Sequence, residues 1–475
     1  MLGQMNGYQN GQTPDPKHKA KKPVHKTTSM TYQQAVDYLM SFWDLEKQTG
    51  LKYKDPHYDL QSFRELLAEL GYPQNSFKSI LIAGTKGKGS TAALVESALR
   101  AQGLSTGLYT SPHLISFCER IKHNGRNILE KDFAQRIEWL KPFLEKRRPQ
   151  PGLPKIRQAT VFEILTAMAF LYFQEMGVEW AVLEVGLGGR LDCTNTVNPR
   201  VSAITNISLD HTDVLGTSLT DIAREKAGII RQDGLVVAAP QSTEAGKVIF
   251  QTAQALNARF FQVGKDLGFK IVDQSEHDIT IDIAGSFGRM TNLTVGLAGE
   301  YQAENAAVAF GVLRCLQYRN HIVPDEAIRQ GFRSVNWPGR FQVVSRKPLI
   351  IMDGAHNDYS AYRLKKATAA LFPDRPQILV LGISANKDIA GIVSNLARDI
   401  KAVIITKARH SRAAAPEAIK AELGKLGIAA IETDRLETAL ERARDLATEE
   451  DVIIITGSLF LVGEALELMG RPGMK

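Results

Sequence analysis

A glycine-rich string, AGTKGKGST at residues 83–91, constrains the fold more than any other feature of this chain. A short apolar run at 79–83 precedes it, and residues 90–102 follow it with apolar side chains at helical spacing. Glycines let a backbone wrap closely around phosphate oxygens, and the free N–H groups at the start of the next helix face the anion. The sequence therefore predicts a strand, a phosphate-binding loop and a helix.

Two side chains strengthen the interpretation of this string as a phosphate loop. Lys88 adds a cation, and the hydroxyl of Ser90 can meet a phosphate or its magnesium ion. The spacing G-x-x-G-K-G-S differs from the common G-x-x-x-x-G-K-[ST] pattern, and a plain glycine turn is the alternative. The lysine, the hydroxyl and the strand-helix context together favour nucleotide binding.

Strand-like runs alternate with helical sequence along the chain, which favours a parallel sheet with helices on both faces. Helices are expected at 32–43 and 60–70. Further buried strands are expected at 107–109, 181–185, 201–207 and 235–239. Short alternating segments within 266–296 indicate an antiparallel patch.

A second α/β series begins beyond a boundary predicted at 334–339. Its strands are expected at 349–352, 378–382, 403–406 and 452–456. We predict a disordered basic tail at 1–30, an ATP-binding domain at 31–336 and a C-terminal domain at 337–475. The predicted fold class is α/β, with a P-loop-type, doubly wound N-terminal domain and a smaller Rossmann-like C-terminal domain.

The net charge of +7 is concentrated at the N-terminus. Residues 1–30 hold one acidic residue, Asp15, and five lysines: Lys17, Lys19, Lys21, Lys22 and Lys26. Such a tail can touch nucleic acid or an anionic surface, but a solvated, disordered leader is favoured. We therefore expect no nucleic-acid partner.

The three cysteines have neither disulfide-framework nor metal-ligand spacing, and a reducing cytosol fits them. No apolar run approaches the roughly 18 residues of a membrane span, and the N-terminal sequence lacks the apolar core of a secretory signal. We expect a cytoplasmic protein with no membrane partner.

Polar residues follow two of the expected strands. Glu184 ends one strand at the edge where α/β proteins collect ligands, and an ion pair with Arg190 is the alternative explanation for its carboxylate. The pair Asp210-His211 closes another strand, although such pairs often only cap helices. If both strands end at one edge, Glu184 and His211 can converge on a magnesium ion whose other ligands are water and phosphate.

Lys226 lies in the expected helix SLTDIAREKAGII. Taken alone, it is interpreted as a surface lysine that pairs with Glu225 or Asp221.

Together, the motifs resemble the folylpolyglutamate synthase/dihydrofolate synthase family within the Mur ligase group. The matching strings include GTKGKGS (84–90), SPHL (111–114), ERI (119–121), TVFE (160–163), EVGLGGRLDCTN (184–195), NISLDHTDVLG (206–216), IAREKAGI (222–229), NAA (305–307), PGR (338–340), DGAHN (353–357) and TGSLFLVGE (456–464). The resemblance spans nearly all of the chain after the tail.

The resemblance implies an ATP-dependent ligase of folate biosynthesis and polyglutamylation. ATP phosphorylates a carboxylate, and the amine of L-glutamate attacks the acyl phosphate. The carboxylate belongs to dihydropteroate in one activity and to a tetrahydrofolate or another folate in the other. The implied cofactors are ATP and Mg²⁺, two ions in all, and the implied assembly is a monomer.

The resemblance also assigns roles to residues. The implied ATP-binding residues are Gly87, Lys88, Gly89, Ser90, Asn305, Arg340 and Asp353. The implied magnesium ligands are Ser111, Glu184 and His211. The implied catalytic residues are Lys88, His356 beside the acyl phosphate, and Lys226 as a carbamylated lysine. The implied pterin pocket consists of Thr160, Val161, Phe162, Glu163, Leu191, Asp192 and Cys193.

Three positions depart from the family pattern. Lys86 stands where asparagine is common, Tyr301 stands where histidine is usual, and Cys193 replaces a small alanine or serine. The leading hypothesis is a bifunctional enzyme, and a monofunctional folylpolyglutamate synthase is the close alternative. A Mur-type ligase for peptidoglycan precursors is more distant. A nucleic-acid-associated ATPase is a different class, which predicts that nucleic acid stimulates ATP hydrolysis through the tail.

Overall fold

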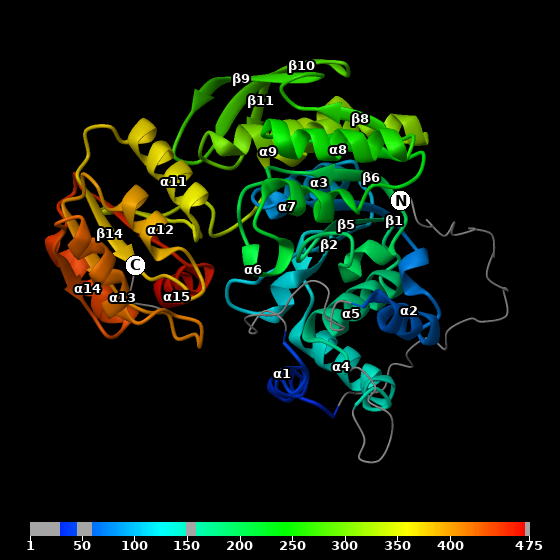
Figure 1. Ribbon diagram of the computed structural model, residues 1–475, viewed down its shortest axis with the longest axis horizontal. Helices are drawn as coiled ribbons and strands as arrows, with labels where there is room; N and C mark the ends of the chain where they lie inside the picture. The colour runs from blue at the N-terminus through cyan, green and yellow to red at the C-terminus, as the bar shows by residue number, and fades with distance from the viewer. Residues whose placement is uncertain (1–28, 45–58, 149–157, 471–475) are drawn as a thin grey trace, which may run out of the picture.

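The computed structural model describes residues 29–44, 59–148 and 158–470, which form two α/β domains side by side (Figure 1). The first domain is drawn from blue to green and the second from yellow to red. Residues 1–28, most of the predicted basic tail, lie outside the described part. Ser29 is described, and its hydroxyl donates to a carboxylate oxygen of Glu138 at 2.7 Å.

The first domain is built on an eight-stranded sheet in the order β4-β3-β2-β5-β1-β6-β7-β8. Its strands are β1 (Lys78–Ala83), β2 (Thr106–Tyr109), β3 (Ile121–His123), β4 (Arg126–Asn127), β5 (Trp180–Glu184), β6 (Pro199–Ile204), β7 (Leu235–Ala238) and β8 (Arg259–Gln262). The six strands from β2 to β8 in this order run parallel, whereas β3 and β4 pair antiparallel at one edge. The glycine-rich string follows β1, between β5 and β6.

Helices cover both faces of this sheet, as the sequence predicted. Its helices are α1 (Tyr32–Met40), α2 (Leu60–Glu69), α3 (Lys88–Ala101), α4 (Glu130–Glu145), α5 (Val161–Glu175), α6 (Thr212–Leu215), α7 (Leu219–Ala227), α8 (Thr243–Ala255), α9 (Tyr301–Cys315) and α10 (Asp325–Arg333). Buried side chains of α3, α9 and α10 form the core on one face, and those of α1, α2, α4, α5, α7 and α8 form the core on the other.

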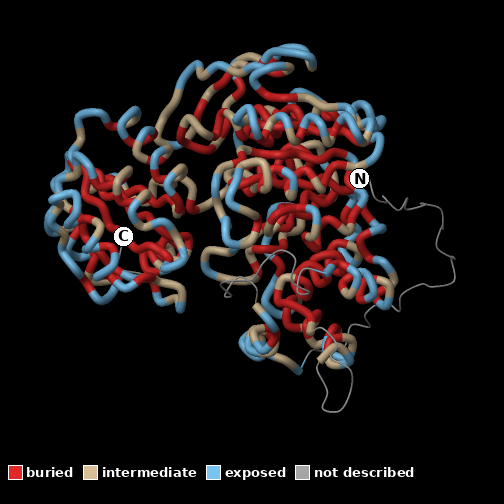
Figure 2. Tube along the Cα trace, viewed as in Figure 1, coloured by how far each residue is buried: buried red, intermediate tan, exposed pale blue. Residues whose placement is uncertain are grey.

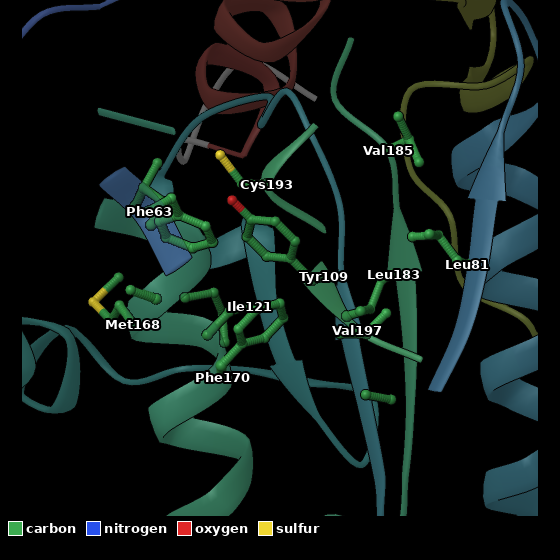
Figure 3. Close-up of a cluster of buried hydrophobic side chains, with 14 of the residues drawn as sticks. Phe63, Leu81, Tyr109, Ile121, Met168, Phe170, Leu183, Val185, Cys193 and Val197 are labelled. Carbon is green, nitrogen blue, oxygen red and sulfur yellow. The ribbon is translucent and has the colours of Figure 1, made fainter. Parts of the chain in front are cut away.

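Side chains of β1 point alternately to the two faces of the sheet, which explains why the first domain has two cores. Ile80 and Ile82 point to the α3 side, whereas Leu81 and Ala83 point to the α5 side. Figure 3 shows the core on the α5 side, where Leu81 faces side chains of the neighbouring strands. Apolar residues on both faces are what a central parallel strand requires, and Figure 2 shows the buried trace running through the middle of both domains.

A separate three-stranded antiparallel sheet confirms the patch predicted within 266–296. It consists of β9 (Leu267–Gln274), β10 (Ile279–Gly285) and β11 (Gly288–Val295), with β10 in the centre. Ile279, Ile281 and Ile283 are buried on one face of β10. They belong to the same hydrophobic core as the buried side chains of α3 and α9, so this sheet packs on the α3 side of the first domain.

The second domain holds a six-stranded sheet in the order β12-β13-β17-β14-β15-β16. Its strands are β12 (Gln342–Arg346), β13 (Leu349–Met352), β14 (Gln377–Leu381), β15 (Ala402–Ile405), β16 (Ala430–Glu432) and β17 (Val452–Thr456). Its helices are α11 (Asp358–Leu371), α12 (Ile389–Leu396), α13 (Pro416–Lys425), α14 (Leu436–Leu446) and α15 (Leu459–Met469). The first three helices cover one face, and α14 and α15 cover the other.

The predicted fold class is confirmed, and the differences lie at the edges of the sheets. The predicted strands end within a few residues of the observed ones, and the predicted boundary at 334–339 lies in the connection between α10 and β12. Five short strands were not predicted: β3, β4, β8, β12 and β16. Most of their residues are partly exposed, so they lack the continuous apolar run that marks a central strand.

Candidate functional site

The phosphate loop lies between the end of β1 and the start of α3. Gly87 has a φ of +89°, and a Cβ at this position would lie 2.1 Å from Oδ1 of Asn305 on α9. The residue therefore has to be glycine for both conformational and steric reasons. No side chain caps the N-terminus of α3 and its first turn holds no acidic residue, so its N–H groups remain available to an anion.

Glu184 lies beside this loop, on the end of the neighbouring strand β5. Its Oε1 is 3.9 Å from Nζ of Lys88, and its Oε2 accepts a hydrogen bond from the backbone N–H of Ser111 at 3.2 Å. Burial raises the pKa of Glu184 above its usual value, and Lys88 opposes that rise. Arg190 instead pairs with Glu225 at 3.0 Å, so the alternative pairing considered for Glu184 is wrong.

Lys226 is buried at the end of α7, so the surface-lysine interpretation is also wrong. The side chain is 5% exposed, and its Nζ donates to the carbonyl oxygen of Gly84 in the phosphate loop at 2.8 Å. Burial, with a further contribution from Lys88, lowers the pKa of Lys226 to about 7. An appreciable fraction of this amine is therefore neutral near pH 7.

The loop after β6 packs directly on the phosphate loop. The backbone N–H of Thr85 donates to the carbonyl oxygen of Asn206 at 2.8 Å, and the hydroxyl of Thr85 donates to the backbone carbonyl oxygen of Ser208 at 3.1 Å. Within the described structure, Oδ1 of Asn206 and Oγ of Ser208 are buried without a hydrogen-bond partner. Buried polar atoms of this kind need a partner, and a bound nucleotide, metal ion or water can supply one.

Contacts cross from the first domain to the second at this loop. Nζ of Lys86 lies 3.0 Å from Oδ2 of Asp210 and 2.8 Å from Nε2 of His356, while Nζ of Lys387 lies 2.9 Å from Oδ1 of Asp210. Burial raises the pKa of Asp210, but Lys86, His211 and Lys387 outweigh it, so the pKa lies well below its usual value. Asp210 is therefore an ionised carboxylate between two lysines.

Asp353 and Arg340 lie where the second domain begins. The carboxylate of Asp353 accepts hydrogen bonds from the hydroxyl of Tyr301 at 3.1 Å and from the backbone N–H groups of Phe341 and Ala355 at 2.8 Å. Tyr301, which departs from the family pattern, thus forms another link from α9 to the second domain. Burial raises the pKa of Asp353, and Arg340 opposes the rise.

The residues of the predicted pterin pocket also have local structural contacts. Thr160 and Glu163 form a capping box at the start of α5, and Asp192 caps the short helix η5 (Cys193–Thr196). Phe162 and Leu191 are half-buried, and a Cβ on Gly186 would lie 2.6 Å from the ring of Phe162. Asp192 accepts from the N–H of Leu187, so both segments lie beside the 186–187 turn. Their role towards a pterin stays a prediction.

A cavity of about 340 Å³ opens between the two domains. The cavity is lined from the first domain by Met40, Asp44, residues 113–115, Phe117, Arg120 and Val161, and from the second domain by residues 408–410, Arg412 and part of α15. The second-domain loop was not singled out from the sequence, although its cluster of Arg409, His410 and Arg412 was the available signal. The ring of His410 stacks on Phe460 at 3.8 Å between centroids.

The predicted magnesium ligands are only partly connected by the observed contacts. The backbone N–H of Ser111 donates to Glu184, whereas Nε2 of His211 lies 3.9 Å from Oδ1 of Asp210. Across the described residues, no group of three or more histidines, cysteines, aspartates or glutamates could hold a metal ion. A set that consists of one hydroxyl, one carboxylate and one imidazole fits Mg²⁺ only if phosphate oxygens and water complete the coordination.

The two α/β domains that meet at the phosphate loop correspond to two domain families of the Mur ligases. The Mur ligase middle-domain family matches residues 82–313, and the Mur ligase glutamate ligase domain family matches residues 339–459. A folylpolyglutamate synthase from Lacticaseibacillus casei is 33% identical over 91% of this chain and 97% of that protein. The chain belongs to the folylpolyglutamate synthase/dihydrofolate synthase family.

Other relatives extend the comparison. The chain spans about half the length of two haloarchaeal relatives. One of them is a probable bifunctional folylpolyglutamate synthase/dihydropteroate synthase from Haloferax volcanii. It is 33% identical to this chain over 92% of this chain and 50% of its own length. Mycobacterium tuberculosis folylpolyglutamate synthase complexed with ADP is 31% identical, with a TM-score of 0.84 over 93% of this chain and 98% of that one. A bifunctional family member with Mn, AMPPNP and L-glutamate bound has a TM-score of 0.79 at 30% identity, over 94% of this chain and 100% of that one.

Proposed function

We propose that this protein is an ATP-dependent amide ligase that adds L-glutamate to dihydropteroate and to folates. The observation that carries the proposal is the phosphate loop, which is surrounded by Lys86, Lys88 and Lys226 and contacted by His356 of the second domain. A carboxylate oxygen of the substrate attacks the γ-phosphorus, and ADP leaves. The amine of glutamate then attacks the acyl carbon, phosphate leaves and the amine loses a proton.

The site residues divide the work of positioning and charge neutralisation. Gly87, Lys88, Gly89 and Ser90 hold the phosphates, and Asn305, Arg340 and Asp353 reach the nucleotide from α9 and from the second domain. Ser111, Glu184 and His211 are the candidate ligands of Mg²⁺, which neutralises phosphate charge when it is bound. Phosphoryl transfer depends mainly on such positioning and electrostatic stabilisation.

Carbamylation of Lys226 deepens this assignment. The reaction needs a neutral amine, and burial lowers the pKa of Lys226 to about 7. A carbamate would exchange a buried cation for an anion, and Lys88 is the largest charged influence on this side chain. These observations support the modified lysine that the family resemblance implies.

The position of the site between the two domains can shield the acyl phosphate from water. An acyl phosphate hydrolyses if water reaches it, and domain closure excludes water while it completes the site. Arg120 from the first domain and Arg409, His410 and Arg412 from the second line the same cavity. We assign this cavity to the acidic substrates.

The test is ADP release that depends on glutamate and magnesium, with dihydropteroate and tetrahydrofolate offered separately. Release with both supports the bifunctional enzyme. Release with tetrahydrofolate alone supports the monofunctional alternative and directs attention to Cys193, which is buried in the predicted pterin pocket. ADP release with neither substrate would favour another Mur-type ligase instead.

The small-molecule substrates are the only partners that we propose, and the proposed assembly is a monomer. Sedimentation equilibrium should then give the mass of one chain, 52.4 kDa. None of the described helices is both long and apolar enough to cross a membrane. The cytoplasmic location stays a proposal.

A further inference from the structure

Four side chains from four different loops meet at the boundary between the two domains. Lys86 belongs to the phosphate loop and Asp210 to the loop after β6, whereas His356 follows β13 and Lys387 follows β14. The side chains of Lys86, Asp210 and Lys387 are 17%, 10% and 13% exposed. Water therefore screens these charges only weakly, and their positions depend on one another.

The donors and acceptors of this cluster determine how His356 is protonated. A lysine ammonium can only donate, so Nε2 of His356 accepts the hydrogen bond from Lys86. The other ring nitrogen, Nδ1, lies 2.7 Å from the carbonyl oxygen of Gly354, which can only accept. His356 is consequently a neutral imidazole with its proton on Nδ1. Burial, Lys86 and Lys387 also lower its pKa well below its usual value.

The positive charge at this point is therefore carried by Lys86 and Lys387, not by His356. The side chain of Lys86 contacts both domains, because it touches Asp210 in the first and His356 in the second. Asp210 also joins the two domains, through Lys86 in the first and Lys387 in the second. Asp210 balances one of the two lysines, which leaves net positive charge facing the phosphate loop.

We propose that Lys86 is a positioning residue that holds the second domain, through His356, in the closed orientation required for glutamate ligation. This inference rests on the proposed function for the reaction it serves, but the domain orientation can be measured without any folate substrate. Without the ammonium, Nε2 of His356 loses its buried donor, and Asp210 loses one of its two lysine partners.

The variant that tests the proposal is Lys86→Asn, because asparagine lacks the ammonium but is a small polar residue that turns and loops accept. Lys86→Arg serves as the rescue, since a guanidinium can donate to both Asp210 and His356. Lys401→Met is the control, because Lys401 pairs with Asp451 at 2.7 Å within the second domain. It loses a lysine ion pair without disturbing the domain boundary.

Three measurements are made on each protein: the radius of gyration from small-angle X-ray scattering, the Kd for ADP, and kcat and KM for glutamate-dependent ADP release. For Lys86→Asn we expect a larger radius of gyration, a kcat reduced at least tenfold and an ADP Kd within about threefold of wild type. Lys86→Arg should restore most of the compactness and of kcat, and Lys401→Met should change none of the three.

Wild-type scattering and kcat in Lys86→Asn would overturn the proposal. A loss confined to ADP affinity would also overturn it, because Lys86 would then act only on the nucleotide phosphates. If the wild-type protein lacks turnover with every folate substrate, the proposed function fails. In that case the scattering and ADP-binding results still decide the role of Lys86.

Discussion

At the scale of single residues, the lysines around the phosphate loop differ in what they contact. Lys88 faces the buried carboxylate of Glu184, Lys226 donates to the loop backbone, and Lys86 reaches into the second domain. These contacts assign a different role to each lysine: Lys88 neutralises charge, Lys226 is the candidate for modification, and Lys86 positions the second domain. Each lysine therefore has its own experiment.

Replacement of Lys88 by alanine should reduce turnover well over tenfold, because it removes a charge that neutralises phosphate in the transition state. Steady-state ADP release measures the effect. Lys131→Ala is a suitable control, since Lys131 is exposed on α4. A Lys88→Ala enzyme with a near-normal rate would contradict the phosphate-loop assignment.

Lys226→Ala should be nearly inactive and should regain part of its activity with short carboxylic acids, if the wild-type lysine is carbamylated. The acid would supply the missing anionic oxygens. Because burial lowers the pKa of Lys226 to about 7, the neutral amine that reacts with carbon dioxide increases as pH rises through 7. The carbamylated fraction of Lys226, measured by intact-mass spectra recorded without acid, should therefore also increase as pH rises through 7. An unmodified lysine together with no rescue would remove the claim.

At the scale of elements, the contact between α3 and α10 depends on one glycine. A Cβ on Gly331 would lie 2.4 Å from Cα of Ala98 and 2.5 Å from its nitrogen, both of them backbone atoms. Backbone cannot move aside as the end of a side chain can, so the two helices would have to separate. Because α3 carries the phosphate loop at its N-terminus, this packing also positions the site.

Gly331→Ala should lower the free energy of unfolding by about 1–3 kcal/mol, the usual cost of overpacking a core. Gly424→Ala on α13 is the matched control, because a Cβ there meets no atom within 4 Å. That change should raise stability by about 0.4–1 kcal/mol by restricting the unfolded chain. Thermal unfolding of the two variants should shift in opposite directions, and equal shifts would show that the close approach does not matter.

Most elements could be predicted from the sequence because buried strands and amphipathic helices have a strong local pattern. The central strands β1, β5 and β6 are mostly apolar and almost entirely buried, and the glycine string identified the start of α3. Edge strands such as β4 and β16 carry exposed residues and pair mainly through their backbones. Their sequences therefore resemble loops, and only the pairing in the folded sheet defines them.

At the scale of the whole molecule, the proposed catalysis depends on how the two domains meet. Lys86–His356, Lys387–Asp210 and Tyr301–Asp353 all join the first domain to the second around the phosphate loop. The family models that match the chain begin at residue 82, so they do not include the tail at 1–28.

Removal of residues 1–28 should therefore leave kcat and KM for glutamate-dependent ADP release nearly unchanged. The truncation keeps Ser29 and its hydrogen bond to Glu138. Nucleic acid should stimulate neither the full-length nor the truncated protein. Stimulation that disappears with the tail would favour the nucleic-acid-associated ATPase instead.

The sequence by itself determined the α/β class, the two series of strands, the phosphate loop and the family. These features are local, since they depend on the period of apolar residues and on glycines at fixed spacing. Only the tertiary structure decided the partners of the charged residues. Lys226 meets Gly84 across 142 positions of sequence, and Lys86 meets His356 across 270. Such pairs depend on the order of strands in the sheet and on the closure of one domain on the other, which no local pattern records.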